Sequence, residues 1–257
     1  MKKQVVYPVF ALAGGLLCAV VRGLQLRSGF EAGTGLPIAG DPCARILAAA
    51  LFALALAWIV LVRRIPQTRQ NPSGSFSESF CGGQILSVTV FAAGIFCWIA
   101  AGAVQLVRAL TGTALLTGAV WGLLTILAAA CLFPALMACR RPQPAFSANA
   151  LLGPVVYLVV TLVVTYRDSS VQPSVQTYYP ALLALAALIL AFFHVAAFAF
   201  RDGRPRRMVL WSALSVTLCL PALVGQSSRF YLLLFAGGAL MQLGLLQLHL
   251  EASAQAA

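Results

Sequence analysis

The chain has 257 residues, of which 61% are hydrophobic and 9% are charged. Soluble domains usually have about 25% charged residues, so this composition excludes a soluble globular protein and predicts that the chain lies in lipid. The formal net charge is +11. Because the basic residues lie between apolar runs, and no basic and aromatic groove is present, they predict membrane orientation and not nucleic-acid binding.

A membrane-spanning helix needs about 20 mainly apolar residues. Eight runs meet this requirement, at about residues 5–21, 44–62, 85–107, 115–138, 150–166, 179–200, 208–224 and 230–250. The second run follows Asp41-Pro42, which is typical of a helix start. No A-x-A cleavage site follows the first run, so we expect an uncleaved first span. The sequence thus predicts one domain over residues 1–257, an all-α polytopic membrane bundle of about eight transmembrane helices.

The basic residues predict that both termini are cytoplasmic. With the N-terminus inside, the inner segments carry eleven of them: Lys2, Lys3, Arg63, Arg64, Arg69, Arg140, Arg141, Arg201, Arg204, Arg206 and Arg207. The outer segments carry six: Arg22, Arg27, Arg45, Arg108, Arg167 and Arg229. An excess of basic residues on the cytoplasmic side is the usual orientation signal.

Residues 22–43 and 63–84 are expected to form the two longer loops, outside and inside respectively. Within the spans, Ala93, Cys97 and Ala101 recur every four residues and predict a helix face that permits close packing. The glycines of the last span have the same effect. Runs one to four and runs five to eight share a loose pattern of basic residues and prolines, so an internal repeat remains open.

The acidic residues argue against catalysis. All six lie in expected loops or at the ends of spans: Glu31, Asp41, Glu78, Asp168, Asp202 and Glu251. A carboxylate-based proton relay or an intramembrane aspartyl protease would need one at mid-bilayer. The zinc-protease and P-loop motifs are also missing from the sequence, so we expect no catalytic residue, metal or cofactor.

His194 is the one ionisable residue expected well inside a span, roughly 9 Å from its inner end. It lies seven residues before Arg201 and so shares a helix face with that residue. Two interpretations remain open. The imidazole forms a hydrogen bond with a neighbouring helix, or it belongs to a substrate or proton pathway.

Several polar residues are expected at the outer ends of the spans. Gln105 and Arg108 lie three residues apart on one helix face, and Arg22, Arg167 and Asp168 lie at other span ends. These arginines either reach towards lipid phosphates or converge on a pocket for an anionic ligand or headgroup. At the inner surface, the turn with Arg201, Arg204, Arg206 and Arg207 is expected to contact anionic lipid.

The segments Tyr166-Arg167-Asp168, Tyr178-Tyr179-Pro180 and 198–207 resemble those of uncharacterised bacterial multi-pass membrane proteins. The resemblance covers about a sixth of the chain. It implies a bacterial plasma membrane and no particular activity.

Two functions are compatible with this sequence. The first is a non-enzymatic accessory or structural membrane protein that contacts lipid and could have a membrane-protein partner. The alternative is a transporter or permease for a small molecule or an anion. Transporters usually have polar groups or broken helices near mid-bilayer. Because the predicted spans contain few such groups, the first function is favoured.

Overall fold

The computed structural model describes residues 2–31, 36–38, 40–65, 76–81, 84–111, 115–140, 148–170 and 175–255. Their helices are, in chain order, α1 (Lys2–Ser28), α2 (Pro42–Arg63), α3 (Phe76–Phe80), α4 (Ile85–Thr111), α5 (Leu115–Ala130), α6 (Phe133–Arg140), the 3-10 helix η1 (Ala148–Leu151), α7 (Leu152–Ser169), α8 (Val175–Ala199), α9 (Pro205–Leu223) and α10 (Arg229–Gln255). In this part of the chain, eight segments are long and apolar enough to span a membrane. The predicted all-α bundle of eight spans is confirmed, and the chain is a multi-pass membrane protein.

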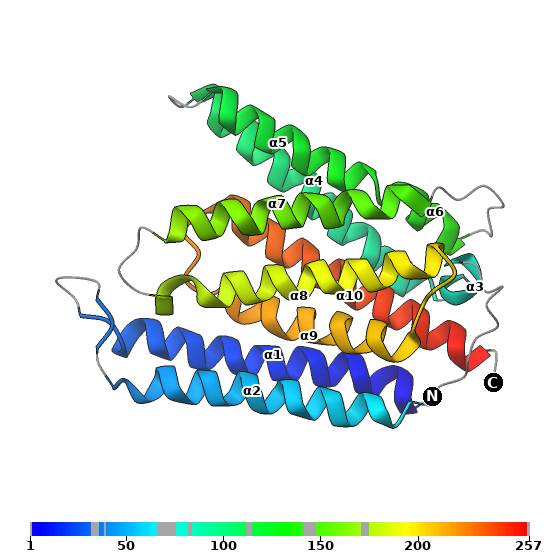
Figure 1. Cartoon of the computed structure of the whole chain (residues 1–257), viewed down its shortest axis with the longest axis horizontal. Helices are drawn as coiled ribbons and strands as arrows, with labels where there is room; N and C mark the ends of the chain where they lie inside the picture. The colour runs from blue at the N-terminus through cyan, green and yellow to red at the C-terminus, as the bar shows by residue number, and fades with distance from the viewer. Residues whose placement is uncertain are drawn as a thin grey trace.

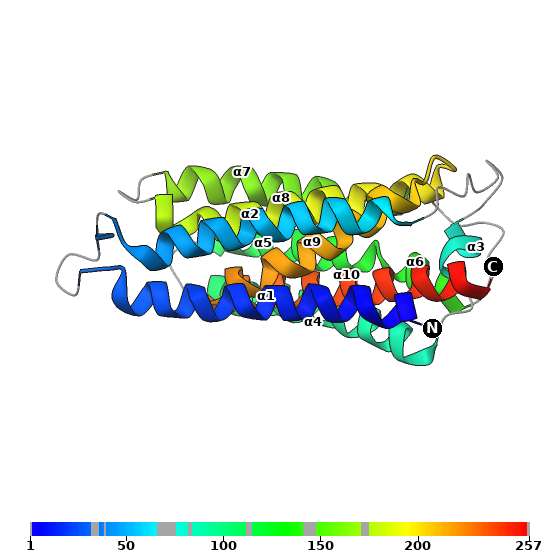
Figure 2. The same ribbon diagram turned by 90° about the horizontal axis from the view of Figure 1, so that it is seen from below.

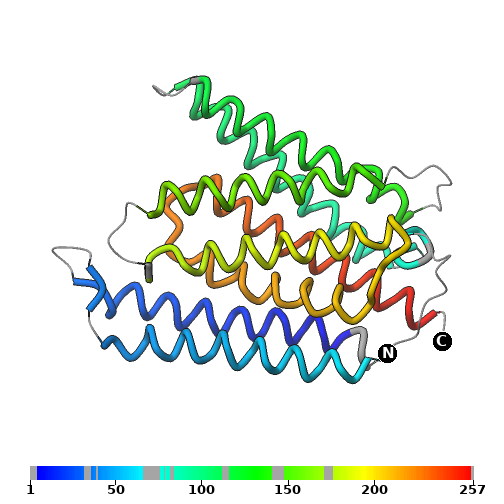
Figure 3. Tube along the Cα trace, in the orientation of Figure 1, coloured from blue at the N-terminus to red at the C-terminus, as the bar shows by residue number. Residues whose placement is uncertain are grey.

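The long helices run along roughly one direction, and the start of α1 and the end of α10 lie at the same end of the bundle (Figures 1 and 3). We call this the termini end. At the opposite end, the hairpin of α4 and α5 leans away from the other helices (Figure 1). We call this the splayed end, and it positions the candidate site described below.

Helix α9 lies in the middle of the bundle, where it packs against α1, α2, α8 and α10. Figure 2 shows α7 and α8 on one side of it and α1, α4 and α10 on the other. In an apolar 18-residue stretch of α9 and of α10, 61% of the residues are buried, against 22% in the corresponding stretch of α2. The outward faces carry large exposed apolar side chains such as Phe52 and Ile85, which lipid would cover in a membrane.

Glycines bring α4 close to two other helices. A Cβ atom added at Gly94 would lie 2.7 Å from the carbonyl oxygen of Gly237 on α10. On the opposite neighbour, a Cβ atom added at Gly102 would lie 2.7 Å from the carbonyl oxygen of Gly122 on α5. Because no side chain separates the backbones at these positions, dispersion contacts between the helices are at their strongest there.

The small face predicted on α4 is only partly the packing face. Ala101 is buried, and Cys97 would meet a Cβ atom added at Gly237 at 2.9 Å. Ala93, however, is exposed. The close contacts are made by Gly94, which faces α10, and by Gly102, which faces α5. Because α4 touches two helices on different sides, its contact positions do not all lie on one face.

Several predicted boundaries were wrong. Helix α1 continues to Ser28 and so includes Arg22, which was expected to end the first span. The expected inner loop contains α3, whose Phe76 and Phe80 are four residues apart and both buried in the core. Their spacing places both rings on one side of a single helical turn.

The predicted cap is confirmed, since Asp41 Oδ1 and Oδ2 accept hydrogen bonds from the amides of Cys43 and Ala44.

Candidate ligand-binding site

A cavity of about 220 Å³ opens at the splayed end. It is lined from α4 and α5, from α7 and from the start of α10 by Gln105, Arg108, Trp121, Thr161, Val164, Asp168, Ser228, Phe230 and Tyr231. Thr161 and Phe230 are buried, whereas Arg108 and Asp168 are exposed at the rim. Pockets for drug-sized ligands measure about 300–1,000 Å³, so this cavity suits a smaller group.

The cavity forms because α4 changes neighbours along its length. Along its first half α4 packs on α10, and at the middle of α4 the indole of Trp98 donates a hydrogen bond of 2.9 Å to the carbonyl of Leu234. Beyond this point α4 stays with α5, where a Cβ atom added at Gly118 would lie 2.8 Å from the Cβ of Ala109. The α4–α5 hairpin therefore diverges from α7 and α10 as an intact pair.

Arg108 is the charge on this cavity that lacks a counter-charge. Its Nη1 donates a hydrogen bond of 3.1 Å to Ser228 Oγ, which is a neutral acceptor at the start of α10. Within the described ranges, no carboxylate lies within 4.0 Å of Arg108. The first backbone N–H groups of α10 add a partial positive charge beside it.

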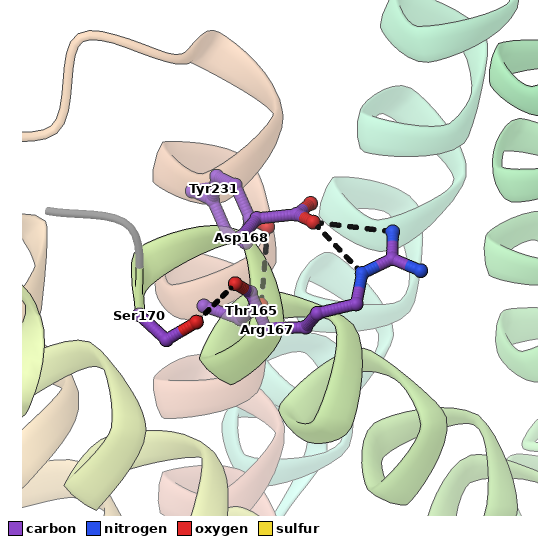
Figure 4. A network of polar contacts seen from close by, with 5 residues as sticks. All are labelled: Thr165, Arg167, Asp168, Ser170 and Tyr231. Carbon is purple, nitrogen blue, oxygen red and sulfur yellow. Dashed lines mark hydrogen bonds and ion pairs between the residues drawn. The ribbon is translucent and has the colours of Figure 1, made fainter.

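Asp168, the other charged residue of the lining, is already paired. Figure 4 shows its carboxylate facing the guanidinium of Arg167, and the Arg167 Nη2 to Asp168 Oδ1 distance is 3.2 Å. Both side chains are more than half exposed. The hydroxyls of Thr165 and Tyr231 lie 3.1 Å apart and connect α7 to α10 behind this pair. The cavity rim therefore carries a net positive charge that belongs to Arg108.

The structure thus brings Gln105, Arg108 and Asp168 together around one cavity, with Arg167 beside it. It does not bring Arg22 there. Arg22 is 3% exposed and forms hydrogen bonds with Gln25 and with the backbone of α8. Its expected position at the rim was wrong because the helix continues past it.

His194 also lies apart from the cavity, near the other end of α8. It is half-buried, and its ring contacts the neighbouring ring of Phe193 with centroids 5.6 Å apart. In the described part of the protein it makes no hydrogen bond to another helix. The predicted interhelical bond is therefore absent there, and a pathway role for His194 remains a prediction.

The basic turn after α8 has two kinds of arginine. Arg201, Arg204 and Arg207 are exposed, so they are available to lipid headgroups. Arg206 is half-buried, and its Nε donates a hydrogen bond of 2.7 Å to the carbonyl of Ile65 just beyond α2. Arg201 adopts a positive φ of 63°, and the amide of Asp202 donates to the carbonyl of Ala197, which ends α8 in a Schellman-type turn.

The sequence did not reveal a buried polar cluster at the termini end. Glu251 was expected at the end of the last span, but α10 continues to Gln255 and Glu251 is 5% exposed. Its carboxylate accepts hydrogen bonds from Ser87 Oγ at 2.9 Å and from the Gln84 amide at 2.7 Å. The alanines that follow Glu251 favour a continuing helix and were the available signal.

His249 belongs to the same end of the bundle. Its ring packs against those of Phe80 and Phe198, with centroids 5.5 and 5.4 Å away, and the two phenylalanine rings also contact each other at 5.4 Å. In the described ranges, no three His, Cys, Asp or Glu side chains gather in a group that could hold a metal ion. The acidic and imidazole side chains of this end are thus held in packing and hydrogen bonds.

Comparison of the chain with protein-family models, with curated proteins and with solved structures finds no match.

Proposed function

We propose that the chain is a non-enzymatic component of a bacterial plasma membrane, and that its cavity at the splayed end binds the anionic headgroup of a lipid. The observation that carries the proposal is Arg108, an arginine on a cavity rim whose hydrogen-bond partner is neutral. A phosphate would supply the missing negative charge and accept charge-assisted hydrogen bonds from the guanidinium. Gln105 and the start of α10 offer further donors beside it.

The apolar lining of the cavity supports a lipid over a free ion. Trp121, Val164 and Phe230 supply surface against which the glycerol and the upper acyl chain of a lipid can pack. Arg108 lies three residues before the end of α4, which corresponds to the headgroup level of a bilayer. Tryptophan and tyrosine side chains such as Trp121 and Tyr231 favour this same level.

Fluorescence quenching tests the proposal directly, because Trp121 lines the cavity. The protein is reconstituted in phosphatidylcholine vesicles with increasing amounts of phosphatidylglycerol that carries brominated chains. The Trp121 contribution is obtained by subtracting the signal of Trp121→Phe. We expect Arg108→Gln to raise the amount of brominated lipid needed by about tenfold, because a hydrogen bond to a charged group contributes about 1.5–3 kcal/mol.

Arg27→Gln is the matched control. Arg27 is an exposed arginine at the same end of the bundle but outside the cavity lining. We expect this variant to bind like the unmodified protein. If both variants lost affinity equally, the lipid would be attracted by diffuse surface charge, and the cavity would not be its site.

The proposed orientation places the termini end in the cytoplasm and the splayed end outside, as the basic residues favour. A reporter enzyme fused after Ala257 tests this. Activity of a cytoplasm-dependent reporter supports the orientation, and activity of a periplasm-dependent reporter reverses it.

A second candidate function is transport, and one observation favours it. Gln242 lies midway along α10 and is fully buried, where Ser212 Oγ donates a hydrogen bond of 2.9 Å to its Oε1. The Gln242 Nε2 atom has no hydrogen-bond partner in the part of the chain that the structure describes. Polar groups at mid-bilayer are typical of transport pathways. The test is uptake of a solute into proteoliposomes. If uptake were saturable and Gln242→Leu abolished it, the function would be transport and not the accessory role.

A further inference from the structure

A second cationic group is enclosed between α1 and α8, away from the cavity of Arg108. Arg22 is 3% exposed. Its Nη1 donates to Gln25 Oε1 at 2.7 Å and to the carbonyl of Gln176 at 2.9 Å, and its Nη2 donates to the carbonyl of Thr177 at 2.9 Å. All three acceptors are neutral, and in the described ranges no carboxylate forms an ion pair with Arg22.

One of these bonds has a plain structural explanation. In a helix, the carbonyl of Gln176 would accept a hydrogen bond from the amide four residues later. That residue is Pro180, which lies inside α8 and has no amide hydrogen. Arg22 supplies the donor that Pro180 lacks. A neutral donor would do the same, so this role does not account for the buried charge.

Around Arg22, in the described part of the chain, the buried hydrogen-bond donors that lack a partner outnumber the buried acceptors that lack one. Arg22 Nε and Gln25 Nε2 are both buried and have no hydrogen-bond partner among the described residues. Gln176 Oε1 is a buried acceptor that also lacks a partner in this part of the chain, but a half-turn of its amide would present donors in its place. Helix α8 begins at Val175, so the partial positive charge of its N-terminus is added to that of Arg22.

We propose that Arg22, Gln25 and Gln176 form a buried binding site for a phosphate group, which is distinct from the cavity of Arg108. The phosphate oxygens would accept hydrogen bonds from Arg22 Nε and Gln25 Nε2 and would neutralise the guanidinium. A water molecule could accept the same two hydrogen bonds, but it would leave the buried charge without a counter-charge. Arg22 lies roughly 9 Å before the end of α1, within reach of a lipid phosphate or of a free phosphate ion.

The substitution Gln25→Glu provides a test that does not depend on removing Arg22. Gln25 Oε1 already lies 2.7 Å from Arg22 Nη1, so a glutamate would place a carboxylate where the phosphate charge is expected. The melting temperature is measured in detergent with sodium phosphate and with sodium chloride at equal ionic strength. We expect phosphate to raise the melting temperature of the unmodified protein by roughly 4 °C per tenfold increase above its Kd. Gln25→Glu should melt higher without phosphate and should not respond to it.

Native mass spectrometry distinguishes the two sources of the phosphate group. If a lipid supplies it, Gln25→Glu retains one anionic phospholipid fewer than the unmodified protein through purification, and inorganic phosphate has no further effect. Arg27→Gln should leave both readouts unchanged. In an Arg108→Gln background, Gln25→Glu should still lose this phospholipid, which separates this site from the cavity. The proposal is overturned if the unmodified protein neither responds to phosphate nor retains a phospholipid that Gln25→Glu loses.

Discussion

The two ends of the bundle use similar polar residues in opposite ways. At the termini end, Glu251, His249 and Arg206 are tied to backbone atoms or enclosed by aromatic rings. At the splayed end, Arg108 and Asp168 are exposed on the rim of a cavity. Helix α4 accounts for the difference, since it packs on α10 at one end and leans away with α5 at the other. Divergence of one hairpin therefore opens a cavity with charged residues on its rim at the splayed end.

The largest expected effect on stability comes from forcing α4 and α10 apart at Gly94, where the backbone of α10 lies close to the added side chain. Gly94→Val would place carbon atoms against the Gly237 carbonyl, 2.7 Å from an added Cβ, and against Met241. We expect a loss of about 3 kcal/mol of stability, because overpacking forces backbone shifts. Thermal unfolding in detergent measures it. Gly23→Ala is the matched control, since its Cβ would meet only Val224 at 3.8 Å. A comparable loss in the control would contradict the explanation.

The second prediction concerns the buried carboxylate of Glu251 and whether its hydrogen bonds stabilise the termini end. Glu251→Leu would leave the Gln84 amide and the Ser87 hydroxyl without their acceptor. We expect a loss of about 2–3 kcal/mol, because hydrogen bonds to a charged group are strong and an unsatisfied buried donor is costly. Ser87→Ala should lose less stability than Glu251→Leu. It removes one donor entirely, so no buried donor is left without an acceptor. Equal stability of Glu251→Leu and the unmodified protein would show that this end is held by apolar packing alone.

Substitution of Arg206 and of Arg108 should separate an effect on stability from an effect on lipid binding. Arg206→Gln should lower stability by about 1 kcal/mol, because its hydrogen bond to the Ile65 carbonyl is lost, and it should leave lipid quenching of Trp121 unchanged. Arg108→Gln should weaken the quenching and change the stability by less than about 0.5 kcal/mol, as expected for an exposed side chain. If the two variants behaved alike in both measurements, the contrast between the ends would not hold.

The smallest effect is expected at the exposed ion pair. Asp168→Asn removes the partner of Arg167, whose side chain is 77% exposed. Solvent-exposed ion pairs contribute about 0–1 kcal/mol, so we expect almost no change in the melting temperature. Loss of the carboxylate should instead increase the positive charge at the rim and modestly strengthen phosphatidylglycerol binding. Weaker binding in Asp168→Asn would place the headgroup elsewhere.

The eight spans could be predicted because hydropathy depends only on the composition of each run. The start of α2 could also be predicted, since Asp41 and Pro42 act within their own turn. Gln105 and Arg108 could be assigned to one face by their spacing. That spacing does not say which helix the face would meet, and the cavity depends on this because its other lining residues come from α5, α7 and α10.

The buried polar groups could not be located from hydropathy for a related reason. Arg22 and Glu251 mark the ends of apolar runs, but their helices continue because backbone hydrogen bonds do not depend on side-chain polarity. Each polar side chain then forms hydrogen bonds with a segment distant in sequence. Glu251 meets the amide of Gln84, and Arg22 meets the backbone of α8. Such pairings follow from tertiary packing, which no local pattern encodes.

The contact between Arg22 and α8 also has a consequence for biosynthesis. The arginine and the carbonyl of Gln176 are 154 residues apart, so α1 is synthesised long before its acceptor exists. At roughly 5–20 residues per second, Arg22 waits about 10–30 s for α8 to emerge. During that interval we expect its guanidinium to stay at the membrane surface, where water and lipid phosphates are available to it. We therefore expect the final seating of α1 to be a late step in the assembly of this protein.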